Sequence, residues 1–529
     1  MNTAPDQSSP DEDSPWKWLT GGWAKGIFAA VLAAVVFYVE EDWRGAMAWQ
    51  EAQAEIAAAG ESLDPAKFIP PTIPDEENFG ALPIFKLESD PSGYNPKNLS
   101  PLAMNRALVH VDQIPSSKDE ETGSSFLPYL GNWQKGEPTD LPAIQKRLTE
   151  LCRTDLPITP LPANATPAQL FELLCPALAD LRAANQTYPL CRFNEDYTSE
   201  PPPLRPLGGV VAQIKMAKVL SYEERLALLD KQPGLALDDM NIDWKIDSGL
   251  RKEPLLISGL VSIGVVAIQL GVVTEGLAEH DWNDRHLAQL DTDLGKIDRL
   301  REFQNCVRGE VALFMIPTVD YTGEHRTFGP DLFFFDLSPV SMRPPWVNFF
   351  SKCASGIIPN GWFDDYKATY AKTHLLGTIK MVDPASRRVF PEKEAHALRY
   401  IEDAKGTSYW RDFLTSSVTP TIHGVRPFAY AQVQVDEARI ACRLERYRLA
   451  HGAYPDSLTA LIPDYGADLP RDVMNGEPYH YKPMKDGTYL LYSVGWDQID
   501  DGGKQSEAQY HSPIDDPDWV WGNHPGTKK

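Results

Sequence analysis

The chain has 529 residues, of which 43% are hydrophobic, so it is long enough for a packed core and for more than one domain. Its formal net charge is −24, from 74 acidic and 50 basic side chains. An acidic surface repels phosphate groups, so we expect no nucleic-acid partner and no broad contact with anionic lipid headgroups.

The first predicted element is a transmembrane helix over residues 19–39, after a polar tail at 1–18. Residues 26–39 carry no charge, and Lys25 lies where a lysine can reach the headgroups. Aromatic residues flank the segment on both sides, as at membrane interfaces. The sequence therefore predicts a single N-terminal anchor, and a cleaved signal peptide is the less favoured alternative because the polar run before it is long.

The charges around this helix predict its orientation. Lys17 and Lys25 precede the apolar segment, and Glu40, Glu41 and Asp42 follow it directly. Because basic residues concentrate on the cytoplasmic side, we expect the N-terminus inside the cell. The predicted location is the bacterial cytoplasmic membrane, crossed once, with the bulk of the chain outside the cytoplasm.

The composition predicts three segments between the anchor and the C-terminal module. Residues 40–60 are rich in Ala and Glu and predict a stalk helix, and residues 61–138 are rich in Pro and irregular. Residues 139–425 predict a helical domain, an antiparallel array, with an aromatic and Pro-rich insertion at 317–360. No fixed repeat length is visible, so a solenoid stays open. Helices are predicted to start at Thr139 or Asp140 and at Thr166-Pro167, and further helices are predicted over 207–220, 222–248, 252–279, 283–316 and 361–415.

A second apolar stretch covers residues 254–274 and is long enough to cross a membrane. Its basic flank, Arg251 and Lys252, lies at the wrong end for a helix returning to the cytoplasm. Ser262 and Gln269 also lower its hydrophobicity. The sequence therefore favours a helix buried inside the helical domain.

The last segment, residues 426–529, predicts a small α+β domain. An amphipathic helix over 427–450 ends at Gly452, and strands over 479–484 and 488–494 are joined by a turn ending in Gly487. The spacing of three arginines predicts the solvent face of the helix. They are Arg439, Arg443 and Arg446.

This module resembles the C-terminal domain of the major pseudopilin of type II secretion. The residues that carry the resemblance are Leu444, Tyr447, Gly452, Tyr454, Pro455 and Leu458, then 469–472, 475–481, and Tyr489, Leu491, Ser493, Gly495 and Asp497. Two features depart from that family. Val473 and Met474 replace its Pro-aromatic pair. The module also lies about four hundred residues from an anchor without the family's leader, since Val31 stands where the processing signal needs a glutamate.

The order of three segments resembles a class of uncharacterised bacterial envelope proteins with a single anchor. The segments are PLCRFNEDY at 189–197, RKEPLLISGLVSIGVV at 251–266, and the C-terminal module. This class has no established activity, so the resemblance implies an architecture only.

The pseudopilin resemblance also implies a calcium site in the loop after the last strand. Several carboxylates in so short a span repel one another, and calcium prefers such hard oxygen ligands. A solvated acidic loop is the alternative. The candidate ligands are Asp497, Asp500, Asp501, Asp515, Asp516 and Asp518.

Three other polar clusters are interpreted as solvated surface rather than as sites, because none has the spacing of a catalytic or metal motif. The aspartates at 238–247 could also form a catalytic acid–base pair, but we interpret them as a solvent-exposed helix face. The clusters are Asp238, Asp239, Asp243 and Asp247; His280, Asp281, Asp284 and His286; and Glu392, Glu394 and His396.

Six cysteines contain no CxxC pair, so a structural zinc site is not expected. Their even number permits disulfides in an exported protein without indicating a pairing, and most are expected to be buried small side chains. They are Cys152, Cys175, Cys191, Cys306, Cys353 and Cys442.

No nucleotide-binding or hydrolase motif is present in the sequence, so it predicts no catalytic residue and no cofactor other than calcium. We therefore expect a mainly α, membrane-anchored scaffold or protein-binding component with a protein partner and no enzymatic activity. Two alternatives stay open. One is an exported hydrolase whose site is assembled from scattered residues, and the other is an accessory protein of a type II secretion or pilus-like system.

Overall fold

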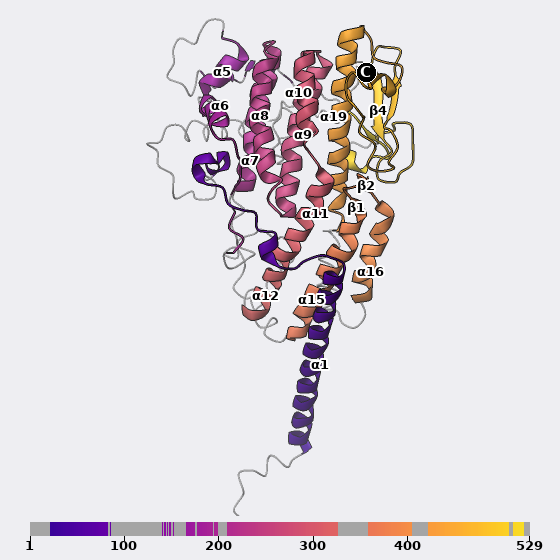
Figure 1. The fold of residues 1–529 in the computed structure, drawn as a ribbon. Coiled ribbons are helices and arrows are strands. Elements are labelled where there is room, and N and C mark those ends of the chain that lie inside the picture. Colours follow the sequence, from indigo (N-terminus) through magenta and orange to yellow (C-terminus); the bar gives the residue numbers. More distant parts are fainter. Residues whose placement is uncertain are drawn as a thin grey trace, which may run out of the picture.

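The computed structural model describes residues 22–82, 165–174, 177–193, 195–198, 209–325, 358–404, 422–506 and 512–522, with isolated positions at 85 and between 140 and 152. The predicted tail at 1–18, most of the Pro-rich segment and most of the insertion at 317–360 lie outside these residues. The described chain is mainly helical with few strands, which confirms the predicted mainly α class (Figure 1).

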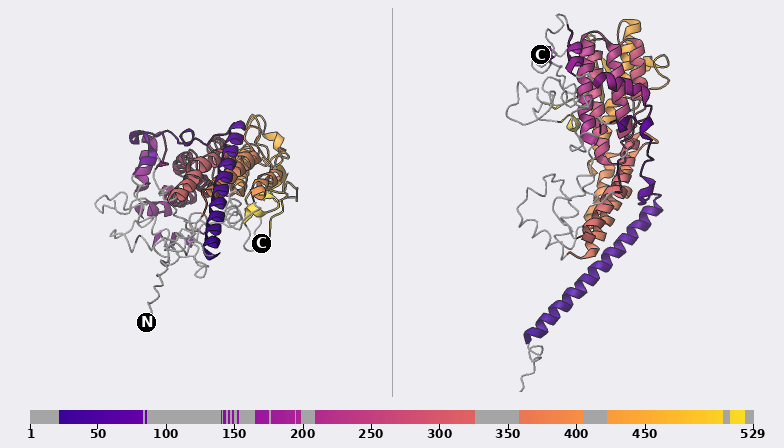
Figure 2. Two further views of the ribbon diagram at one scale, coloured as in Figure 1. Left: turned by 90° about the horizontal axis from the view of Figure 1, so that it is seen from below. Right: turned by 90° about the vertical axis from the view of Figure 1, so that its left-hand side faces the viewer.

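Helix α1 (Gly22–Ala58) is one continuous helix over the segments predicted as anchor and stalk. Its first half projects away from the body, and its second half lies against the body (Figures 1 and 2). Gly60, at a φ of 81° that only glycine adopts freely, follows the helix and turns the chain. Three 3₁₀ turns then run along the surface, at Pro65–Lys67, Asp75–Glu77 and Phe79–Ala81.

Seven helices form an array (Figure 1). They are α5 (Pro167–Leu174), α6 (Ala177–Thr187), α7 (Gly209–Leu229), α8 (Pro233–Leu250), α9 (Leu256–Ala278), α10 (Asp284–Leu294) and α11 (Arg299–Gly309). In this array α7, α8 and α9 pack on one another. The break that the sequence suggested near residue 221 is wrong. The chain turns at Lys231, with a φ of 58°, just before Pro233 starts α8.

Helix α9 is the apolar stretch for which the sequence favoured a buried position. It is long and apolar enough to cross a membrane, but 61% of its apolar window is buried inside the protein. It packs on α7, α8, α11 and α19, which confirms the buried position. Its polar residues Ser262 and Gln269 are buried and face carboxylates of α8.

The predicted helix over 283–316 is divided, since the chain turns between α10 and α11. Helix α11 continues into a π-helix (Glu310–Met315) and α12 (Ile316–His325). The predicted helix over 361–415 is also interrupted. It consists of α15 (Asn360–Lys372), a π-helix (Thr373–Gly377), a 3₁₀ turn (Thr378–Met381), the hairpin β1 (Val382–Asp383) and β2 (Arg388–Val389), a 3₁₀ turn (Pro391–Lys393) and α16 (Glu394–Ala404).

The C-terminal part begins with the long helix α19 (Val425–His451), which Gly452 ends at a φ of 81°. A 3₁₀ turn (Leu458–Leu461) leads to an antiparallel sheet in the order β3-β4-β5. Its strands are β3 (His480–Pro483), β4 (Tyr489–Ser493) and, after the 3₁₀ turn Pro513–Asp515, β5 (Trp519–Val520). The predicted hairpin is confirmed, whereas β5 was missed because two residues carry no visible alternation.

Helix α19 belongs to the array as much as to the sheet. One continuous hydrophobic core includes residues of α9, α10, α11, α15, α19 and β4. The boundary predicted between 425 and 426 therefore falls just after the first residue of a helix that is common to both parts.

The arginines of α19 do not form a solvent face, so that expectation is wrong. Arg439 and Arg443 bond Asp291 of α10 at 2.9 and 2.8 Å, and Arg446 bonds Asp284 at 2.8 Å. The arginine spacing places them on one side of α19, and the complementary acids lie on a helix far away in sequence. Helix α10 covers this side, so the array and α19 are joined by ion pairs as well as by apolar contacts.

Candidate functional site

The loop predicted to bind calcium is organised around Asp518, which is fully buried. Its Oδ2 accepts hydrogen bonds from the backbone N–H groups of Asp501 at 3.1 Å, Gly503 at 2.8 Å and Lys504 at 3.1 Å. A carboxylate that accepts three backbone donors holds the two sides of the loop together by itself.

The other predicted ligands have separate partners. Asp497 accepts from the N–H of Ile499, Asp500 from the hydroxyl of Tyr492, Asp515 pairs with Arg426, and Asp516 accepts from the N–H of Ser506. The described residues contain no group of three or more His, Cys, Asp or Glu side chains arranged to hold a metal ion. Calcium binding therefore stays a prediction from the sequence resemblance.

The Asp518→Asn variant distinguishes a loop that is held together by Asp518 alone from a loop that also binds calcium. Replacing the carboxylate weakens three charge-assisted hydrogen bonds, so we expect a loss of about 2 kcal/mol in the free energy of unfolding. The measurement is thermal melting with millimolar calcium and with a chelator. If calcium is bound, the wild-type melting midpoint rises with calcium and the variant midpoint responds less. Identical midpoints of the wild type in calcium and in chelator would exclude the calcium site.

The acidic stripe of α8 lies inside the array, so the interpretation as a wet helix face is wrong. Asp239, Asp243 and Asp247 are each 0% exposed. Their spacing of four residues puts them on one side of the helix, and that side faces α6, α7 and α9. Buried carboxylates need compensating partners, which come from distant parts of the chain.

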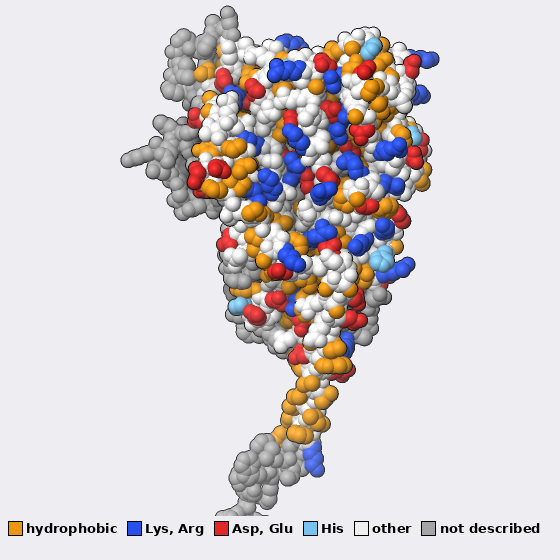
Figure 3. Space-filling model, in the orientation of Figure 1, with side chains coloured by type: hydrophobic (Ala, Val, Ile, Leu, Met, Phe, Trp, Pro, Cys, Tyr) orange, Lys and Arg blue, Asp and Glu red, His pale blue; other side chains and the backbone are white. Residues whose placement is uncertain are grey.

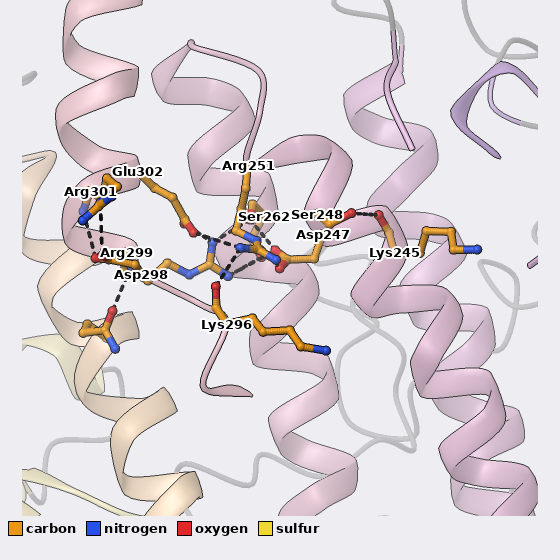
Figure 4. Close-up of polar contacts among 11 residues, drawn as sticks. Lys245, Asp247, Ser248, Arg251, Ser262, Lys296, Asp298, Arg299, Arg301 and Glu302 are labelled. Carbon is orange, nitrogen blue, oxygen red and sulfur yellow. Dashed lines mark hydrogen bonds and ion pairs between the residues drawn. The ribbon is translucent and has the colours of Figure 1, made fainter. Parts of the chain in front are cut away.

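The centre of the buried site is Arg299 at the start of α11, which is fully buried (Figure 4). Its Nη1 donates to Glu302 Oε2 at 2.6 Å and its Nη2 to Asp247 Oδ1 at 3.2 Å. Arg299 Nη1 also donates to the Ser262 hydroxyl at 2.6 Å, and that hydroxyl donates to Asp247. The second arginine, Arg251, bonds Asp247 Oδ2 at 2.8 Å. We name these five residues the Arg299 node.

The Arg299 node connects four helices. Asp247 lies on α8, Ser262 on α9, and Arg299 and Glu302 on α11. The backbone N–H of Arg299 donates to the side-chain carbonyl of Gln432 on α19 at 2.8 Å. Because two arginines face two carboxylates, the charges of the node balance.

Burial still affects these groups. Desolvation raises the pKa of Glu302 to about 6 although Arg299 favours its charged form. The guanidinium of Arg299 and both carboxylates are shielded from solvent, so the arrangement can orient helices but offers no reacting group to a substrate.

A second ion-pair cluster lies around Asp239, at the opposite end of the three buried aspartates of α8 from Asp247. Arg182 of α6 bonds both oxygens of Asp239, at 2.7 and 3.0 Å, and pairs with Glu223 of α7. Burial, followed by repulsion from Asp239, raises the pKa of Glu223 to about 8. Sequence reasoning missed Arg182, Arg299, Glu223 and Glu302. One sequence signal could have identified some of these buried charges. An acidic residue surrounded by apolar residues, such as Glu223 in α7, indicates a buried carboxylate that needs a partner.

The two motifs behind the envelope-protein resemblance meet in space. Arg192 Nε lies 3.3 Å from Glu253 Oε1, and the Tyr197 hydroxyl donates to Glu253 Oε2. The carbonyl of Arg192 accepts from Asn78 Nδ2 at 2.8 Å. These contacts tie the segments 189–197 and 251–266 to the 3₁₀ turns after α1.

The remaining polar clusters have ordinary partners in the described residues. His280 Nδ1 lies 2.9 Å from Glu445, and Glu394 lies 2.9 Å from His423. Cys191, Cys306 and Cys442 are buried and not disulfide-bonded, as expected for small apolar side chains. No family model, curated protein or solved structure matches this chain.

Proposed function

We propose that this protein is a scaffold or protein-binding component of the bacterial envelope, held at the outer face of the cytoplasmic membrane by the first half of α1. The observation that carries the proposal is the contrast between the two halves of this helix. In residues 22–39 the large apolar side chains are exposed, and in residues 40–58 the helix lies on the body.

The exposed side chains cover the helix on all sides rather than along one stripe. Nine large apolar residues of this half are between 46% and 70% exposed, namely Trp23, Ile27, Phe28, Val31, Leu32, Val35, Val36, Phe37 and Val39. In Figure 3 this part of α1 is almost entirely apolar, with a basic group toward its free end. Burying each large apolar side chain is worth roughly 1.5–3 kcal/mol, which favours a bilayer over water.

The length and the charges of this half support the same location. Residues 22–39 rise about 27 Å at 1.5 Å per residue, close to the roughly 30 Å of a hydrocarbon core. Acids follow at 40–42 and Lys25 lies near the N-terminal end of this half, which supports a cytoplasmic N-terminus.

The second half of α1 supports a scaffold because it holds the body in a defined position. Asp42 Oδ1 accepts from the N–H of Gly361 at 2.9 Å, and the Trp362 indole donates to Glu41 at 2.8 Å. Farther along, Glu61 forms two bonds with Arg308, at 2.7 and 2.9 Å. A rigid helix that leaves a bilayer and continues into a helical body would present that body to a protein partner at a defined height.

The test compares two arginine substitutions in the same helix. The V31R/V35R variant places two charges in the proposed hydrocarbon region, at about 2.5–3.5 kcal/mol each, and we expect release from carbonate-washed membranes. The control M47R changes a side chain that is 49% exposed but lies beyond Asp42, and it should stay in the membrane fraction. Protease added to spheroplasts should digest the C-terminal part of the wild type.

Wild-type protein found in the soluble fraction would contradict the anchor. A C-terminal part protected until lysis would contradict the orientation. Crosslinking of wild type in intact cells then tests the partner, since a scaffold should yield a discrete higher-mass product that V31R/V35R loses.

A further inference from the structure

Two carboxyl groups of the acidic interior belong to neither ion-pair cluster. Glu224 of α7 and Asp243 of α8 are both 0% exposed, and their carboxyls lie within hydrogen-bonding reach of each other. The side-chain Nε2 of Gln269, from α9, donates to Asp243 Oδ2. The pair therefore lies where three helices meet.

The oxygens of this pair lack donors. Both oxygens of Glu224 and Oδ1 of Asp243 are buried and accept no well-formed hydrogen bond within the described residues. Two ionised carboxylates can only accept hydrogen bonds, so they cannot bond each other. One proton placed between them turns one oxygen into a donor and removes one of two adjacent buried charges.

The nearby cations are already used. Arg182 is bonded to Asp239 and Glu223, and Arg225 is bonded to Glu275 at 2.8 Å and to the carbonyl of Ser221 at 3.2 Å. The other ionisable groups that act on the pair are mostly acids and add repulsion. The groups around it are Arg182 on α6, Glu223 and Arg225 on α7, Asp239 and Asp247 on α8, Glu275 on α9, and Arg299 on α11, which pairs with Asp247 and Glu302.

We propose that Glu224 and Asp243 form a buried proton-binding site that holds one shared proton at neutral pH and couples its loss to loosening of the contact between α7, α8 and α9. Oxygen atoms without donors would also attract a hard metal ion. The described residues offer no group of three or more acidic, His or Cys side chains arranged for one, and a proton needs only two oxygens.

The direction of the pH dependence follows from the burial. Desolvation, and next the repulsion between these and neighbouring acids, raises the pKa of both groups well above the ordinary value. In the unfolded chain both carboxyls are ionised above about pH 5. The folded state therefore binds one more proton at neutral pH, and stability falls as the pH rises from about 5 toward the raised pKa.

The experiment measures urea unfolding of the full-length protein in detergent micelles between pH 6 and 8. Each extra proton bound by the folded state makes the unfolding equilibrium constant rise tenfold per pH unit. Other buried acids contribute to the wild-type slope, so the comparison with E224Q is decisive. We expect the slope of E224Q to be smaller by about one tenfold step per pH unit. D238N, which changes the exposed neighbour on α8, should keep the wild-type slope.

The double variant E224Q/D243N tests whether the reduced slope of E224Q comes from the lost proton or only from disturbed packing. Its two amides can bond each other without a proton, so it should fold, show the reduced slope, and keep the same protection factors for its α7 and α8 amides at pH 6 and pH 8, after the exchange rates are corrected for intrinsic exchange at each pH. In wild type these protection factors should fall at pH 8. Parallel slopes for wild type and E224Q, or a double variant that does not fold at pH 6, would overturn the proposal.

Discussion

The Arg299→Ala variant is expected to lose about 3–5 kcal/mol of unfolding free energy, the largest effect of any single change in the array. The guanidinium is fully buried and is shared between Asp247 and Glu302. Its removal leaves these buried carboxylates facing a single, partly exposed arginine, Arg251. The measurement is urea unfolding at neutral pH, monitored by circular dichroism.

Arg301→Ala is the matched control on the same helix. This side chain is 70% exposed and lies 3.5 Å from Asp298, so its loss should cost at most about 1 kcal/mol. If both variants changed the unfolding free energy equally, the Arg299 node would contribute no more than a surface ion pair.

The second large effect is expected where α1 meets α15. A Cβ added to Gly45 would lie 1.9 Å from the backbone oxygen of Gly361, and one added to Gly361 would lie 1.9 Å from that of Glu41. Backbone cannot give way as a flexible side chain does, so Gly45→Leu should push the helices apart at a cost of about 3 kcal/mol. The buried residues Ala52 and Ile56 would lose their contacts. Hydrogen exchange should then become fast over residues 44–56 while the array stays protected.

Gly26→Leu provides the control in the same helix, because a Cβ at Gly26 would meet nothing within 4 Å. Its exchange pattern and melting midpoint should match those of the wild type. Unchanged protection of residues 44–56 in Gly45→Leu would mean that the close contact with α15 does not hold α1 on the body.

Local signals in the sequence predicted a good part of the fold. Asn283 starts α10 by accepting a hydrogen bond from the His286 N–H, and Gly452 ends α19. Gly487 forms the turn of the predicted hairpin with a φ of 85°. Each of these features depends on a few neighbouring residues, so a short window of sequence is enough to predict it. The interruptions after α15 were missed because they depend on contacts with α11 and α16.

The polar interior could not be predicted in the same way. The sequence by itself determined that Asp239, Asp243 and Asp247 share one side of α8, and that the arginines of α19 share another, because helical spacing decides which residues lie together. It did not determine whether these sides meet water or another helix. The tertiary structure decided that, by bringing Arg182 and Arg299 to the acids and α10 to the arginines of α19. The physical reason is that burial and charge pairing depend on partners 50 to more than 100 residues away, which no local pattern contains.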